Sequence, residues 1–359
     1  MNKYNSEKIY GFDYLRAICC MLVVAIHAGI PSLFLSYKSL YNFISYNIGA
    51  LAVPIFFQIS FILFFLSRKK QEDYFFKKRF FKLIKLYLAW GLISQLLYLL
   101  VINEISVNQL IDLTDMRKLI VFIITDGYSN PFYFFFSLLF LTTFAELFAF
   151  YIDKTKINNE LICYSALIVF CIIVFLLPLS VMFFGKEFAI LAQHFNPLNF
   201  VPYVFSSFLI KNEISKTQLN SFSYFNKKNL SILILFIVFA IFEWKYLDYP
   251  LLWNGFREDF IPTDSEDALP VYSRLSLVFG AWSIALISLK VRSEPHFIVK
   301  LFSDLSLGVY CLHSFFVILL LRIFPSTGYA LVLIFFITLL LSTILTKFFK
   351  RFKIFKDLV

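Results

Sequence analysis

Residues 13–27 read DYLRAICCMLVVAIH, and this stretch is the first of several long apolar runs that decide the fold class. Apolar and aromatic residues make up 60% of the 359-residue chain, and charged residues only 16%. Soluble domains contain about 45 to 50% apolar residues. The composition therefore excludes a soluble enzyme and predicts an all-α, polytopic helical bundle in a membrane.

The apolar windows predict about ten membrane-spanning helices, since a crossing needs about 20 residues. The predicted spans are 12–36, 48–66, 83–102, 131–152, 161–184, 198–210, 229–247, 271–290, 305–324 and 327–349. The sixth is short for a full crossing, and Leu119–Thr125 is predicted to be a re-entrant or interfacial segment. Because ten crossings leave only short loops, residues 1–359 are expected to form a single integral-membrane domain without a separate extracytoplasmic domain.

The distribution of charge predicts the orientation of these spans. Lysine and arginine accumulate in cytoplasmic loops, and with a cytoplasmic N-terminus most of the 33 basic residues fall on that side. Both termini are therefore predicted to be cytoplasmic. The formal net charge of +10 is spread over short loops, so we expect contact with membrane lipids and no binding of nucleic acid.

The five cysteines are expected to be packing residues inside the predicted spans, since none has the spacing of a metal ligand pair. They are Cys19, Cys20, Cys163, Cys171 and Cys311. We therefore expect no metal site.

Polar residues in the first span point to a functional site. Arg16 and His27 are eleven residues apart, close to three helical turns, so they share one face about 16 Å apart along the axis. Arg16 is predicted at the cytoplasmic boundary, where an arginine can simply snorkel to the interface. His27 is predicted near the midplane, where a histidine usually serves a pathway or a reaction. Asp13 is spaced to pair with Arg16, or is a plain first-turn acid.

A basic segment leads into the third span. Lys78, Lys82 and Lys85 fall on one stripe of a helix, with Arg79 beside them. Such a surface suits either anionic lipid headgroups or a phosphorylated ligand.

Later spans carry further polar residues. Ser306, Tyr310 and His313 follow one another at four- and three-residue steps and face one way, as a site or as hydrogen-bonding residues that join helices. Glu146 is a lone intramembrane carboxylate, and Glu243 lies near the outer end of the seventh span. The sequence assigns no partner to either glutamate.

At these residues the chain resembles the acyltransferase-3 family of bacterial membrane proteins along nearly its whole length. Asp13, Arg16 and His27 are similar to the acid, arginine and histidine of the family's first helix. The segment VPIFFQISFIL at 53–63 is similar to its second-span pattern, although Phe61 stands where glycine is usual, and Lys82 stands where arginine is common. Ser306, Tyr310 and His313 look like its late serine, tyrosine and histidine.

The resemblance implies transfer of an acyl group from cytoplasmic acyl-CoA, most commonly acetyl-CoA, to a hydroxyl of a cell-envelope or exported polysaccharide. Some relatives are thought to use succinyl or other acyl groups. The resemblance implies that the protein binds a glycan acceptor. It is also compatible with a homo-oligomer or with binding to other proteins of envelope biosynthesis.

The residues support this chemistry by physical argument. Arg16, Arg79 and Lys82, with Lys78 and Lys85, form a basic rim for polyanionic CoA. His27, with Asp13 and Arg16 on its helix, either takes a proton from the acceptor hydroxyl or accepts the acyl group covalently. The substrate side is assigned to Glu146, Ser306, Tyr310 and His313.

Two other classes of protein remain open at this point. A transporter or flippase for lipid-linked sugars would use His27, Glu146 and Arg16 as a proton or substrate pathway, and a membrane subunit of an envelope-assembly complex would have no activity. Four aromatic residues are expected to stack on sugars or to form a membrane belt. They are Trp244, Tyr246, Tyr249 and Trp253.

Overall fold

The protein is described by a computed structural model at residues 8–102, 116–125, 132–155, 158–178, 191, 193–216, 226–247, 271–353, 355 and 358. Over these residues it is all-helical and contains no strand, which confirms the predicted fold class. The helices are α1 (Tyr10–His27), α2 (Lys38–Asn42), α3 (Ala52–Lys70), α4 (Phe81–Ile102), α6 (Met116–Thr125), α7 (Tyr133–Lys154), α8 (Asn159–Leu176), α10 (Val201–Lys216), α11 (Lys227–Phe242), α12 (Leu275–Ser288), α13 (Phe297–Leu321) and α14 (Tyr329–Phe349).

Each of the ten predicted spans overlaps one of these helices. Among the described residues, seven helical segments are long and apolar enough to cross a membrane. The other three, α10, α11 and α12, have 16, 16 and 14 residues. At about 1.5 Å per residue these are shorter than a hydrocarbon core of about 30 Å. The chain is thus an integral membrane bundle, whereas ten full crossings and two cytoplasmic termini stay predictions.

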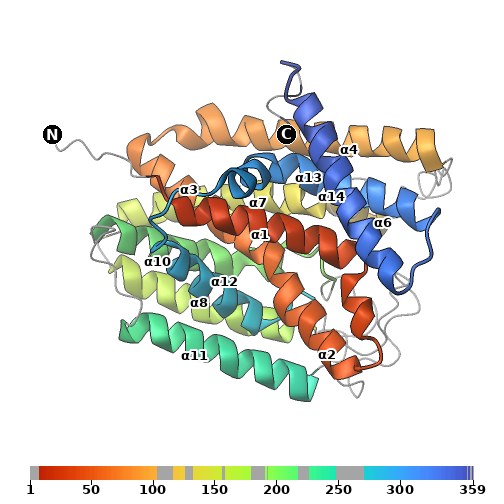
Figure 1. The fold of residues 1–359 in the computed structure, drawn as a ribbon. Helices are drawn as coiled ribbons and strands as arrows, with labels where there is room; N and C mark the ends of the chain where they lie inside the picture. The colour runs from red at the N-terminus through yellow and green to blue at the C-terminus, as the bar shows by residue number, and fades with distance from the viewer. Residues whose placement is uncertain are drawn as a thin grey trace.

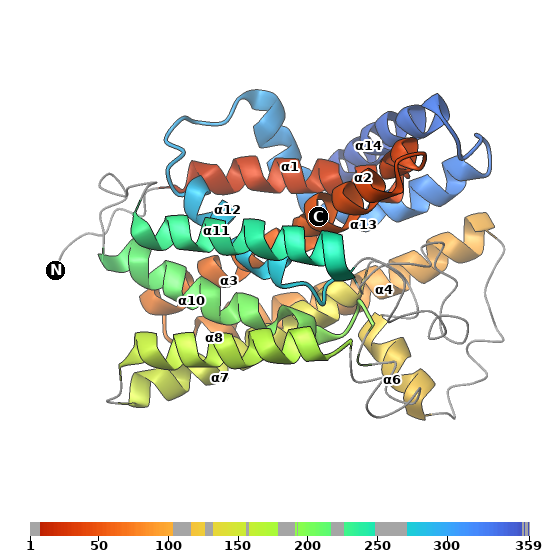
Figure 2. The same cartoon turned by 90° about the horizontal axis from the view of Figure 1, so that it is seen from below.

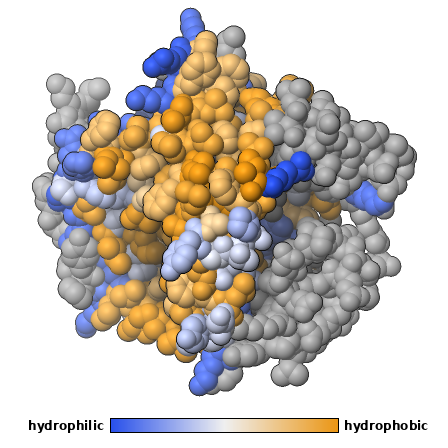
Figure 3. Space-filling view, turned by 45° about the vertical axis from the view of Figure 1, so that its right-hand side comes forward, coloured by the Kyte–Doolittle hydropathy of each residue, from blue (hydrophilic) through white to orange (hydrophobic). Residues whose placement is uncertain are grey.

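Most of the long helices lie side by side along one direction, while α14 crosses them obliquely (Figure 1, Figure 2). One face carries a broad area of hydrophobic side chains, with hydrophilic side chains gathered toward its edges (Figure 3). Large apolar residues are exposed along α8 and α11, among them Ile168, Ile172, Ile234 and Val238. In water such surface would favour association, so these exposed sides of α8 and α11 are suited to contact with lipid.

The contacts between α1 and α13 show that these two helices run in the same direction. Near their starts, the Ser303 hydroxyl donates a hydrogen bond of 3.1 Å to the Asp13 carboxylate. Further along both helices, the rings of His27 and His313 lie 4.9 Å apart. The first and ninth predicted spans must be parallel if successive spans alternate in direction, and this pairing agrees with that topology.

A buried polar network joins α3 to α10. Gln58 donates to the Ser207 hydroxyl at 2.8 Å and accepts from Ser206 at 2.9 Å, while Ser207 also donates to the Gln58 carbonyl at 3.1 Å. All three side chains are fully buried. Polar groups inside a membrane bundle must find partners within the protein, and this network fixes the register of α3 against α10.

A glycine permits close packing at the start of the bundle. A Cβ atom added to Gly11 would lie 1.8 Å from the carbonyl oxygen of Ser288, at the end of α12. The backbones of α1 and α12 therefore approach too closely for any side chain at this position, as is common between membrane helices.

The prediction that the first helix continues to residue 36 is wrong. Helix α1 ends at His27, and Gly29 adopts a left-handed conformation with φ of 80°, which ends the helix. The chain then forms a short 3-10 turn at Ile30–Phe34, in which Pro31 follows the first residue. His27 consequently lies at the end of its helix and not near the middle of a long one.

The segment predicted to be re-entrant or interfacial is a ten-residue helix, α6. Its backbone carbonyl at Ile123 accepts a hydrogen bond of 2.6 Å from the Tyr87 hydroxyl of α4. Ten residues extend only about 15 Å, so α6 is too short to cross a bilayer.

Candidate active site

A basic cavity of about 400 Å³ lies between α1, α3, α4, α7 and α13. Arg79, in the π-helical segment Phe75–Phe80 that precedes α4, and Lys82 of α4 line it. Arg16 of α1 and Ser306 of α13 add to its polar lining from other helices. The Arg79 guanidinium donates to the Ser60 hydroxyl through Nη2, and its Nε is buried without a hydrogen-bond partner among the described residues. A buried unpaired donor is costly, and the Arg79 side chain retains the capacity to donate one more hydrogen bond.

Asp13 orients Arg16 without lining the cavity. Its carboxylate lies 3.6 Å from the Arg16 guanidinium, accepts the hydrogen bond from Ser303 and pairs with Lys8 at 2.9 Å. Lys8 lies outside the membrane-spanning helices, and its hydrogen bond to Asp13 raises its pKa. The Asp13 carboxylate thus ties α1 to α13 and holds Arg16 at the edge of the basic cavity.

The basic residues predicted to form one stripe before the third span do not all face the basic cavity. Lys82 reaches the basic cavity, whereas Lys78 and Lys85 are exposed and do not line it. The cavity-facing positions 79, 82, 83 and 86 are spaced as one helical face. Lys78 and Lys85 lie beside that face.

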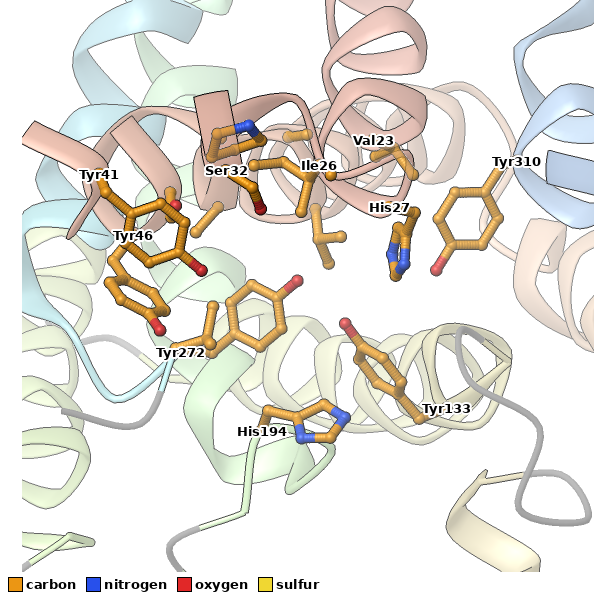
Figure 4. A pocket seen from close by; sticks show the side chains of 18 residues that line it. Val23, Ile26, His27, Ser32, Tyr41, Tyr46, Tyr133, His194, Tyr272 and Tyr310 are labelled. Atoms are coloured by element: carbon orange, nitrogen blue, oxygen red, sulfur yellow. The ribbon is translucent and has the colours of Figure 1, made fainter. Parts of the chain in front are cut away.

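A second cavity, of about 290 Å³, begins where α1 ends. His27 is exposed to it, and the tyrosine rings around it point their hydroxyl groups inward (Figure 4). The polar lining includes His194, Tyr41, Tyr46, Tyr133, Tyr272 and Tyr310. We call this space the histidine cavity.

His27 and His313 face each other, but their rings differ in hydrogen bonding. The His313 ring is fully buried, with Nδ1 2.5 Å from the Tyr310 carbonyl and Nε2 3.3 Å from the Ser314 hydroxyl. No described residue forms a hydrogen bond with the His27 ring. His27 is therefore free to exchange a proton with a molecule in the histidine cavity, whereas His313 is a packed neighbour.

Several polar residues of the histidine cavity were not predicted from the sequence, among them His194, Tyr133 and Tyr272. His194 lies in a short irregular segment, and its ring is 5.4 Å from that of Tyr133. The rings of Tyr133 and Tyr272 lie 6.2 Å apart, and both line the cavity. Burial lowers the pKa of His194 to about 4, so its ring is neutral near pH 7. The rarity of histidine, with four in the chain, was the signal available for His194.

The polar residues of α13 extend from one cavity to the other. Ser306 lines the basic cavity, Tyr310 lines both cavities, and His313 packs against His27. The predicted common face of these three residues is therefore observed, with each at a different height along α13.

Glu146 lies outside both cavities. The Nε of Arg68 lies 3.0 and 2.9 Å from its two carboxylate oxygens, and the same guanidinium bonds Asp153 at 2.7 Å. This network joins the end of α3 to α7. Its geometry is that of a structural ion pair.

We expect Glu146→Gln to lower the free energy of unfolding by about 2 kcal/mol, because it leaves a half-buried Arg68 with one acidic partner fewer. Acyl transfer by the folded variant should be close to that of the unaltered protein. Thermal unfolding and an activity assay in detergent test both statements. Loss of activity without loss of stability would contradict the structural role and would support Glu146 as part of a proton or substrate pathway.

Among the described residues, no group of three or more histidine, cysteine, aspartate or glutamate side chains is arranged to hold a metal ion. The polar side chains that line the two cavities are those of arginine, lysine, histidine, tyrosine and serine.

Comparison with known proteins gives one result that covers nearly the whole chain. The model of the acyltransferase-3 family, described as an acyltransferase domain, matches residues 9–347. No curated protein and no solved structure shows significant similarity. The match begins before Asp13 and ends after His313, so it includes every residue of both cavities. The chain belongs to the acyltransferase-3 family.

Proposed function

We propose that the protein transfers an acyl group, with acetyl as the first candidate, from cytoplasmic acyl-CoA to a hydroxyl of a cell-envelope or exported polysaccharide. The proposed location is the cytoplasmic membrane of a bacterium. The observation that carries this proposal is the adjacency of a cationic cavity and a histidine cavity that meet at Tyr310.

The basic cavity suits the polyanionic end of CoA. Arg79 offers a guanidinium fork with one free buried donor, and Lys82 and Arg16 add two further cations at the same cavity. With its phosphates held there, the pantetheine arm would direct the thioester along α1 toward His27, about 16 Å from Arg16 by helix geometry.

The histidine cavity suits the acceptor hydroxyl and the chemical step. In the proposed mechanism, a ring nitrogen of His27 takes the proton of the acceptor hydroxyl while its oxygen attacks the thioester carbonyl. The tetrahedral intermediate then collapses, the carbon–sulfur bond breaks, and the CoA thiolate takes the proton from His27. The products are an oxygen ester and CoA. Tyr133 and Tyr272 offer hydroxyl groups and flat apolar rings of the kind that sugars contact.

The test is thermal unfolding of the purified protein with CoA. A hundredfold excess over the dissociation constant should stabilise it by about 2.7 kcal/mol. Labelled acetyl-CoA should then be hydrolysed slowly alone, and its acetyl group should pass to the polysaccharide when an acceptor is added.

A lack of stabilisation at millimolar CoA would refute the proposed donor. Movement of lipid-linked sugars across vesicles without any CoA requirement would instead favour a transporter. Comparison of the envelope polysaccharide from cells with and without the protein would identify the acceptor.

A further inference from the structure

The basic cavity and the histidine cavity share one lining residue, Tyr310. Every other residue that lines one of them is absent from the lining of the other. Tyr310 therefore lies where the two cavities adjoin.

The ring of Tyr310 is held by aromatic neighbours. Its centroid lies 5.2 Å from the ring of Phe134, 6.3 Å from Phe56 and 6.4 Å from Phe135. Contacts of this kind are individually weak, about 0.5 to 1.5 kcal/mol each beyond area burial. A ring held in this way can rotate when a ligand supplies replacement contacts.

Space for that rotation is present on both sides. Cavities of about 400 and about 290 Å³ flank Tyr310, although the ring itself is only 4% exposed. Its hydroxyl points into the histidine cavity, toward the space between His27 and Tyr133 (Figure 4). The ring thus stands as a partition between two open volumes.

A partition serves the proposed reaction. A permanent opening between the basic cavity and the histidine cavity would admit water to the thioester. It would also leave a leak across the membrane. If the Tyr310 ring moves aside only when the pantetheine arm carries an acyl group, both the entry of water and the leak are prevented.

We propose that Tyr310 is a gate between the donor cavity and the acceptor cavity, which the acyl-bearing arm of CoA opens by displacing its ring. The role as a gate for CoA rests on the proposed function, but closure of the passage by the ring is a property of the protein alone. The ring and not the hydroxyl forms the barrier.

A cysteine in the histidine cavity tests closure without any donor. Val53 lines that cavity from α3, and Val53→Cys changes little volume. In sealed vesicles with the Arg79 end facing the medium, a charged, membrane-impermeant methanethiosulfonate reagent should label this cysteine slowly. Adding Tyr310→Ala should accelerate labelling at least about tenfold, whereas Tyr310→Phe should leave it slow because the ring remains.

The five native cysteines are buried, and the protein without Val53→Cys gives their background. If Tyr310→Ala does not fold, Tyr310→Leu, which also lacks the ring, replaces it. Equal labelling rates with and without the ring would overturn the gate, as would labelling with Tyr310→Phe as fast as with the ring removed. Failure of the proposed function would be seen separately, as the absence of CoA stabilisation in the unaltered protein.

Discussion

Replacement of His27 by glutamine is expected to lower acyl transfer by about 10³-fold, the range expected when a general base is removed. The physical reason is that His27 is exposed to the histidine cavity and has no hydrogen-bond partner among the described residues, so its ring is free to take the acceptor's proton. Stabilisation by CoA should persist, because Arg79 and Lys82 belong to the other cavity.

The control is His296→Gln, which changes the same residue type at an exposed position at the start of α13. It should reduce stability slightly, because the His296 side chain accepts a hydrogen bond from the Ile298 amide, and it should retain transfer. Single-turnover rates with labelled acetyl-CoA make the comparison. Wild-type rates in folded His27→Gln would exclude His27 as the base.

The second large effect is expected on donor binding. Arg79→Ala should weaken CoA binding by between about 10- and 100-fold, the equivalent of about 1.5 to 3 kcal/mol for hydrogen bonds to a charged group. Arg79→Lys should restore little of this loss, because an ammonium group lacks the planar fork of a guanidinium. Isothermal titration with CoA measures both variants.

Lys78→Ala is the matched control for Arg79→Ala. It removes one positive charge from the neighbouring position, but Lys78 is exposed and does not line the basic cavity. Its effect on CoA affinity should be small and should diminish as salt screens the surface charge. If Lys78→Ala weakened binding as much as Arg79→Ala, general attraction to the basic segment would explain binding and the basic cavity would not.

Several features of the candidate site were predictable because helical periodicity is a local property. The three-residue and four-residue steps of Ser306, Tyr310 and His313 placed them on one face, and the structure has them there. The same reasoning failed for the extent of the first helix. Gly29, in a left-handed conformation, ends α1, and it lies with Pro31 inside a run whose mean hydropathy stays high.

Other features depended on partners distant in the chain. Glu146 appeared as an isolated carboxylate because its partner Arg68 is 78 positions away. His194 had no periodic context to mark it, and it joins the histidine cavity only when its segment packs beside Tyr133.

The sequence by itself determined the membrane environment, the all-helical class and the family, because these follow from apolar content and from spacings within single helices. Only the tertiary structure decided which polar residues share a cavity. It separated Arg79 and Lys82 from Lys78 and Lys85, and it set Tyr310 between the two cavities. The physical reason is that a cavity is bounded by several helices at once, and their relative rotation is fixed by packing contacts between residues remote in the chain.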